Sequence, residues 1–164
     1  MKYVVAVAAL LAGCMSLAKL PPREYYVLND LGDAAVSMRG GQNDRALLIS
    51  ETSVSPFYDT QSLVFSRAPG QRAYYQFAAW TERPGSRLTE LLVHRLYARG
   101  SFRSVTATTA GAKGDLILNT RLEEIYHDAS ASPGSVRIQM SSELVDRVQH
   151  AIVAQHSFTQ SAPT

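Results

Sequence analysis

The chain has 164 residues, of which 46% are hydrophobic, with 16 Lys and Arg against 14 Asp and Glu. This composition lies in the globular range and excludes a disordered chain, and the length is enough for one domain with a substantial core. The near-neutral charge and the lack of any basic run exclude a phosphate-tracking surface, so nucleic acid is not an expected partner.

The first 13 residues have the pattern of a secretory signal peptide. Lys2 precedes an apolar and small-residue run from Tyr3 to Gly13, and a basic start, a short apolar core and a small-residue cleavage site define such peptides. The run is too short for a transmembrane helix, which needs about 20 apolar residues. We predict a signal peptide at 1–13, a tether at 14–23 that Pro21-Pro22 keeps extended, and one domain at 24–164.

Four segments between residues 24 and 80 are candidate strands. Residues 24–28 form the first, and residues 45–54 are apolar on both faces, which indicates a strand covered on both sides. Residues 63–66 and 72–79 flank Ala68-Pro69-Gly70-Gln71, a sequence typical of a hairpin connection.

One helix is predicted after this hairpin. Pro84 suits the first helical position, and Gly100 suits the stop. Between them four leucines recur at helical spacing, which predicts one apolar face: Leu88, Leu91, Leu92 and Leu96. Arg95 lies beside this face, so we expect its stem to be buried and its guanidinium to reach solvent.

The rest of the chain favours strands. Residues 102–108, 115–126, 136–144 and 151–158 are candidates. Apolar and polar residues alternate in 115–126 and 136–144, and the last three segments are predicted to form an antiparallel meander with one solvated face. The predicted fold is therefore α+β: a single domain of mostly antiparallel sheet, with a helix or helices packed on one face.

No catalytic, metal or cofactor site is predicted. The four histidines, His94, His127, His150 and His156, do not recur at metal-ligand spacing. Glu123 and Glu124 are adjacent on a predicted strand and point to opposite faces, so they form no catalytic pair. We therefore expect a protein that is not an enzyme and that needs no cofactor. The aromatic residues at 74–77 and Trp80 fill the core or line a groove for lipid or peptide; core is the simpler interpretation.

Residues Leu11-Ala12-Gly13-Cys14 resemble the bacterial lipoprotein box. The resemblance implies cleavage between Gly13 and Cys14, and a diacylglyceryl thioether plus an N-acyl chain, such as palmitate, on Cys14, the only cysteine. Several acyl chains anchor a protein stably, whereas one does so marginally. Met15 rather than Asp at the second mature position implies the outer membrane, facing the periplasm, by similarity to lipoprotein sorting. The alternative is an ordinary signal peptide and a chance cysteine.

A series of soft motifs runs in order along nearly the whole chain: the lipoprotein box, residues 25–28, 52–58, 63–67 and 74–80, the leucine helix, residues 115–118 and 142–146, and Phe158. In this order they resemble the ABC-type transport auxiliary lipoproteins, which include the Pqi-type lipoprotein. That family implies an accessory role beside an inner-membrane ABC transporter and an MCE-type substrate-binding protein, in systems that move lipids or other hydrophobic compounds.

Two other functions stay open, and one departure matters. The chain could be a free-standing lipoprotein that binds a hydrophobic ligand, or an adaptor in envelope assembly; a homo-oligomer is compatible with each. Family members usually continue into a C-terminal helix that packs on the sheet, whereas this sequence stops at Ser161-Ala162-Pro163-Thr164. We expect a shortened member or a fragment, with an apolar patch on the sheet left open.

Overall fold

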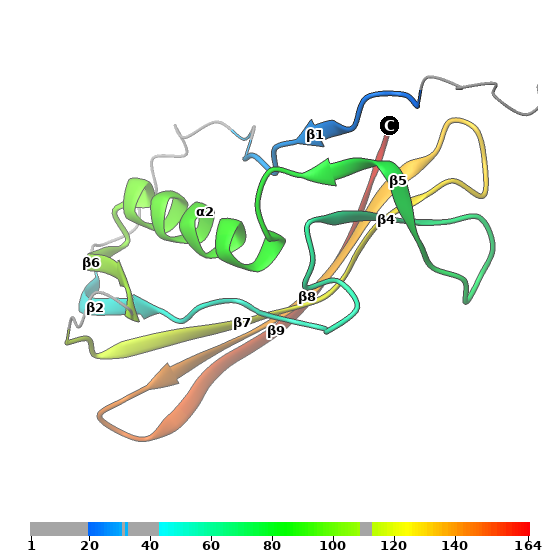
Figure 1. Cartoon of the computed structure of the whole chain (residues 1–164). Helices are drawn as coiled ribbons and strands as arrows, with labels where there is room; N and C mark the ends of the chain where they lie inside the picture. Colours follow the sequence, from blue (N-terminus) through cyan, green and yellow to red (C-terminus); the bar gives the residue numbers. More distant parts are fainter. Residues whose placement is uncertain (1–19, 31, 33–42, 109–112) are drawn as a thin grey trace, which may run out of the picture.

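A computed structural model describes residues 20–30, 32, 43–108 and 113–164. They form a single domain of one open sheet with one helix packed against it (Figure 1). The elements in chain order are β1 (Glu24–Tyr26), β2 (Asn43–Ile49), β3 (Ser53–Val54), β4 (Ser62–Ser66), β5 (Ala73–Trp80), α2 (Pro84–Arg99), β6 (Phe102–Ala107), β7 (Leu116–Asp128), β8 (Ser135–Asp146) and β9 (Ala151–Pro163).

Strand β7 is the axis of the sheet. Along one edge it pairs in parallel with β2, β3 and β4 in succession, and β2 continues to β6 while β4 continues to β5 and β1. Along its other edge β7 pairs antiparallel with β8, and β8 pairs antiparallel with β9. The two long antiparallel ladders confirm the predicted meander and contain most of the paired residues.

The parallel pairing of β2 with β6 is connected through the helix. Strands β2 and β6 run parallel, and parallel neighbours need a long crossover connection, which here includes α2. Figure 1 shows α2 lying over the β2 and β6 end of the sheet. The helix begins at Pro84 and ends at Gly100, which has a φ of 63° and donates its N–H to the carbonyl of Tyr97, as the sequence predicted.

The predicted strand at 45–54 is two strands, β2 and β3, because residues 50–52 leave the ladder. The prediction that this segment is covered on both faces is confirmed, since Ala46, Leu47, Leu48 and Ile49 are all buried. Arg95 holds the predicted rim position, where its guanidinium pairs with Asp30.

The core consists of two clusters along β7. The first cluster comprises Tyr58, Val64, Leu122, Ile125 and Tyr126, and the second comprises Leu47, Ile49, Val105 and Leu116. Strict alternation along β7 fails in the first cluster, because the register with β8 shifts between Leu122 and Glu124. Ile125 and Tyr126 are therefore both buried, and Tyr126 is covered by the guanidinium of Arg72, 3.7 Å from its ring centroid.

Within the described residues, no helix is long and apolar enough to cross a membrane.

Candidate functional site

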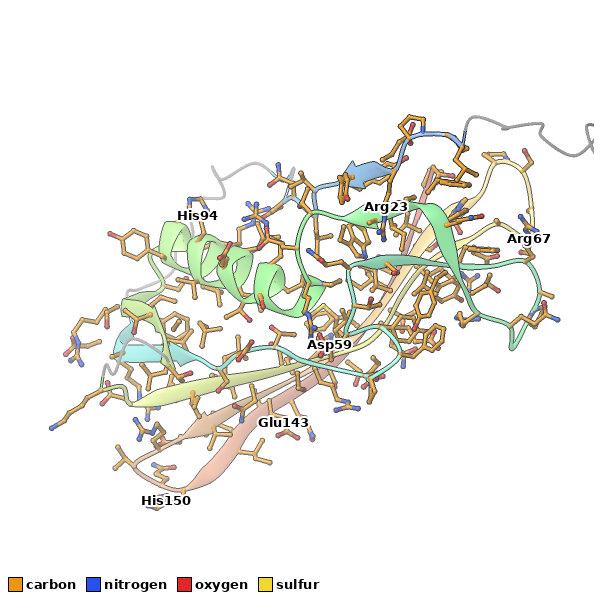
Figure 2. All side chains as sticks on the ribbon, viewed as in Figure 1. Arg23, Asp59, Arg67, His94, Glu143 and His150 are labelled. Carbon is orange, nitrogen blue, oxygen red and sulfur yellow. The ribbon has the colours of Figure 1, made fainter. Side chains whose placement is uncertain are left out.

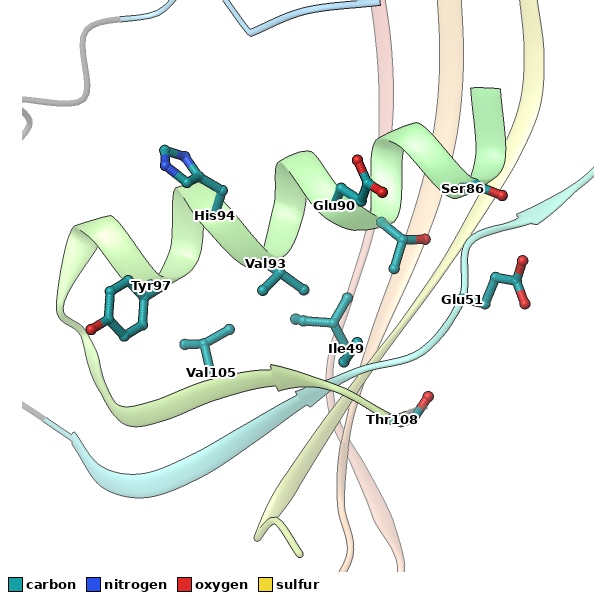
Figure 3. Close-up of a pocket in the computed structure, with 11 residues that line it drawn as sticks. Ile49, Glu51, Ser86, Glu90, Val93, His94, Tyr97, Val105 and Thr108 are labelled. Atoms are coloured by element: carbon teal, nitrogen blue, oxygen red, sulfur yellow. The ribbon is translucent and has the colours of Figure 1, made fainter. Parts of the chain in front are cut away.

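Of the concave surfaces on the described residues, the two with the most apolar lining lie at the helix and at the β1–β5 side. We call the first the helix groove; it has a volume of about 580 Å³ and lies between α2 and the strands β2 and β6 (Figure 3). Its floor is apolar, formed by Ile49, Val93, Val105 and Ala107, and its rim carries Glu51, Ser86, Thr89, Glu90, His94, Tyr97 and Thr108. The two carboxylates give the rim an acidic character.

A chain of threonines fixes the wall of the helix groove. The hydroxyl of Thr89 accepts the backbone N–H of Thr52 at 2.9 Å, and the hydroxyls of Thr52 and Thr120 lie 2.8 Å apart. Thr52 and Thr120 are buried, so these bonds join α2 to β7 away from solvent. Because buried hydrogen bonds are costly to break, these bonds stabilise the contact of α2 with β7 beside the groove.

We call the second surface the aromatic groove; it has a volume of about 850 Å³. Six aromatic side chains from β1, β4 and β5 line it: Tyr26, Phe65, Tyr74, Tyr75, Phe77 and Trp80. Pro21 and Pro22, just before β1, line it too. A groove of this size and composition fits an apolar ligand or chain segment.

Side chains of three strands, β4, β5 and β7, contact one another in the aromatic groove. The rings of Phe65 and Tyr75 have centroids 4.5 Å apart, and the Tyr75 hydroxyl lies 2.7 Å from Nδ1 of His127. Nε2 of His127 is buried and has no hydrogen-bond partner in the structure, and it lies against Gly134, where an added Cβ would be 2.1 Å away. Arg67 is the cation of the groove, with its guanidinium 5.0 Å from the Phe65 centroid.

A polar cluster beside the first core cluster has a structural role. Arg72 donates to the hydroxyl of Tyr58 at 3.1 Å and to the carboxylate of Glu124 at 3.3 Å. Burial raises the pKa of the Tyr58 hydroxyl, although the Arg72 hydrogen bond opposes the shift. All three side chains are used in joining the β4–β5 hairpin to β7.

The residues singled out in the sequence are dispersed. Gly13 and Cys14 lie outside the described residues. Glu123 binds Gln139 and Ser141, whereas Glu124 pairs with Arg72, so the two carboxylates do not face a shared site.

The histidines are dispersed as well. His94 lines the helix groove, whereas His127 lines the aromatic groove. Figure 2 shows how far apart the two grooves lie, since His94 and Arg67, a second residue of the aromatic groove, are on opposite sides of the view. His150 lies in the β8–β9 turn and His156 on β9. In the part of the chain that the structure describes, no group of three His, Cys, Asp or Glu side chains could hold a metal.

The grooves were only partly visible in the sequence. Trp80 packs against the first core cluster, in line with the core interpretation, but Tyr75 and Phe77 are only half-buried and line the aromatic groove. The available signal was that aromatic residues occupy both even and odd positions of β5, and so both faces of the strand. A strand with a single buried face needs aromatic residues on that face only. The helix groove had no such signal.

The chain matches a family model described as the ABC-type transport auxiliary lipoprotein component, over residues 26–164. Its fold is similar to the crystal structure of a DUF330 protein from Xanthomonas campestris, at 19% identity and a TM-score of 0.76, covering 85% of this chain and 78% of the other. A second crystal structure, of an uncharacterized protein, has 14% identity and a TM-score of 0.66, covering 87% of this chain and 81% of the other. No curated protein matches the sequence.

Proposed function

Because the chain belongs to the family of ABC-type transport auxiliary lipoprotein components, we propose that it is a membrane-anchored, periplasmic accessory subunit of an ABC/MCE-type system that moves lipids or other hydrophobic compounds across the envelope. The family match, which spans the whole folded domain, is the observation that carries the proposal. The proposed role is docking and not catalysis.

The proposed anchor is the lipid on Cys14, with residues 14–23 as the tether to the domain and the outer membrane as its location. One contact among the described residues supports this arrangement. Pro21 and Pro22, the end of the tether, line the aromatic groove, so the groove lies where the tether joins the domain. A membrane anchor would therefore hold this apolar surface toward the bilayer side.

The proposed partners are an MCE-domain substrate-binding protein and the subunits of the ABC transporter. The test is crosslinking of the full-length lipoprotein in membranes, followed by pull-down and identification of the captured proteins. We expect MCE or ABC subunits with the wild type and a reduced yield with Cys14→Ser. Wild-type capture of envelope proteins unrelated to transport would reject the proposed function.

The anchor has a separate readout. Labelling with radioactive palmitate should mark the wild type and not Cys14→Ser, and the variant should leave the membrane fraction. Equal labelling of the two proteins would reject Cys14 as the acylated residue.

One observation favours a second function, direct binding of a hydrophobic ligand. The aromatic groove has the size and the apolar lining of a small-molecule site, and Arg67 at its edge could pair with an anionic headgroup. The test is mass spectrometry of organic extracts of the purified protein. Phe77→Lys should lower the bound lipid, whereas Tyr97→Lys, at a 70% exposed aromatic outside this groove, should not. Equal lipid in both variants would reject the groove as the site.

A further inference from the structure

Strand β9 forms one open edge of the sheet in the described part of the chain. Among the described residues it pairs with β8 and with no other strand, and Figure 1 shows it as the outermost strand of the long β7–β9 arm. All 13 of its residues are exposed, including Ile152 at 56%, Val153 at 48% and Phe158 at 46%. Within the described residues, nothing covers the outer side of β9 along its length.

The backbone groups that face outward can be assigned from two contacts. Thr164 donates its N–H to the carbonyl of Gly134, and the carbonyl of His156 faces β8, where it accepts from the side-chain hydroxyl of Ser142. Even-numbered residues of β9 thus direct their backbone groups to β8, and the register is regular from Ala154 onward. Because successive residues alternate, the outward set is Gln155, Ser157, Thr159 and Ser161, followed by Pro163, which has no N–H to leave unpaired.

From Ala154 to Ala162 this edge lacks the features that normally prevent strand addition, because its register shift lies before Ala154 and its proline is Pro163. Native edges carry charged side chains, prolines or bulges. From Val148 to Thr164 the sequence contains no Asp, Glu, Lys or Arg, and its one proline is Pro163. Charged residues make up 18% of the chain, so a segment of this length would hold about three at the average density. The outward backbone groups are available, and no charge repels an incoming strand.

We propose that β9 pairs antiparallel with β9 of a second copy of this chain, across a two-fold axis at Phe158. In this register Gln155 opposes Ser161 of the partner subunit, and Ser157 opposes Thr159 of the partner subunit. All four outward residues then find an outward residue opposite, which gives about eight backbone hydrogen bonds at two per pair. The sheet runs without interruption from one copy into the other.

The side chains match in the same register. Phe158 meets Phe158 of the partner subunit in a pair without mutual backbone bonds, where Cα atoms approach to about 4.5 Å and side chains are closest. Aromatic cross-strand pairs are stabilising, and this one covers a ring that is 46% exposed in the single chain. Ala154 meets Ala162 of the partner subunit, so small faces small on the same side of the sheet.

A second copy is the favoured occupant because of the missing charge. In a two-fold interface each patch meets itself, so any net charge on the strand would meet the same charge and oppose pairing. A neutral strand is the kind that pairs with itself without this cost. The paired length from Ala154 to Ala162 is about 30 Å, which is small for an interface, so the expected dimer is weak and is best detected by covalent trapping.

The test is cysteine crosslinking of the full-length protein in membranes with a mild oxidant. The wild type, whose one cysteine is Cys14, measures the background of crosslinking through that residue. Phe158→Cys should give a disulfide-linked dimer, because its two copies meet at the axis. Ala154→Cys should give none, since its two copies are about 27 Å apart in this register. The double variant Ala154→Cys/Ala162→Cys should regain the dimer. Failure of Phe158→Cys, or equal crosslinking by Ala154→Cys alone, would overturn the register.

A charge-swap experiment tests the self-pairing itself. The double lysine variant Ser157→Lys/Thr159→Lys and the double glutamate variant Ser157→Glu/Thr159→Glu should each lose Phe158→Cys crosslinking, because like charges lie opposite each other. Mixing the two should restore a crosslinked heterodimer. Persistent dimers in the lysine variant alone, or Phe158→Cys adducts only with other proteins, would overturn the proposal.

Discussion

Replacement of Gly85 by alanine sets two effects of known size against each other. Gly85 is the second residue of α2 and is buried. Alanine is the better helix former, so propensity alone predicts a gain of at most about 1 kcal/mol. An added Cβ, however, would lie 2.6 Å from Cγ2 of Val54 and 2.9 Å from the carbonyl oxygen of Thr52.

The second contact cannot relax cheaply. The backbone of Thr52 is held by its N–H bond to Thr89 at 2.9 Å, and its hydroxyl by Thr120 at 2.8 Å. Overpacking of this kind costs about 1–3 kcal/mol, so the steric cost should exceed the gain in helix propensity. We expect Gly85→Ala to lose about 1–2 kcal/mol of unfolding free energy, which is a fall of about 2–8 °C in melting temperature for a domain of this size.

The assay is urea unfolding followed by circular dichroism, with Ser86→Ala as the matched control. Ser86 is the next residue of the same helix and is exposed, so its substitution should leave stability unchanged or raise it by about 0.5 kcal/mol. If Gly85→Ala proves as stable as Ser86→Ala, the close approach of α2 to the Thr52 carbonyl is wrong.

Three other predictions concern the core, the β8–β9 turn and the aromatic groove. Leu122→Ala removes a side chain that is 0% exposed and should cost about 2–5 kcal/mol in urea unfolding; a loss below 1 kcal/mol would place Leu122 outside the core. Hydrogen bonds from the Arg45 side chain and from two turn N–H groups lower the pKa of Asp146 below its ordinary 3.8, so its stabilisation is complete above that value and lost as the pH falls through the lowered pKa. The difference in urea midpoint between wild type and Asp146→Asn should therefore shrink in acid, and a pH-independent difference would contradict this. Tyr75→Phe removes the hydroxyl 2.7 Å from His127 and should cost about 1 kcal/mol in the same assay; no change would show that this bond is not formed in solution.

The sequence predicted the elements better than their partners. Pro84 and Gly100 bounded the helix correctly because both act through local backbone conformation. The alternation from Val136 to Leu144 predicted β8 because one face of that strand is solvated. Which strands become neighbours in the sheet is not a local property. No pattern in the residues of β2 indicates that β6 and β7 flank it in parallel.

The site was harder to predict than the fold for the same reason. The aromatic groove joins side chains from β1, β4 and β5 with His127 on β7, and such a surface exists only after the strands are paired. The bulge between Leu122 and Glu124 also escaped prediction, because a register shift depends on the partner strand and not on the pattern of β7 alone. Cys14 stays a prediction: its signal is a short contiguous motif, and the residue lies outside the described residues.

The position of β7 at the centre of the sheet determines when the rest of the domain can fold. Leu47 on β2 pairs with Leu116, and Phe65 on β4 pairs with His127, so the N-terminal strands wait for a partner that is synthesised more than 60 residues later. Such non-local topologies fold slowly, in milliseconds to seconds, because a long loop must close before its contacts form. A nascent chain that lacks β7 contains the hairpin and the helix but no continuous sheet to pack them on. The sheet of the N-terminal strands therefore cannot be completed until the last third of the chain, which contains β7, has been synthesised.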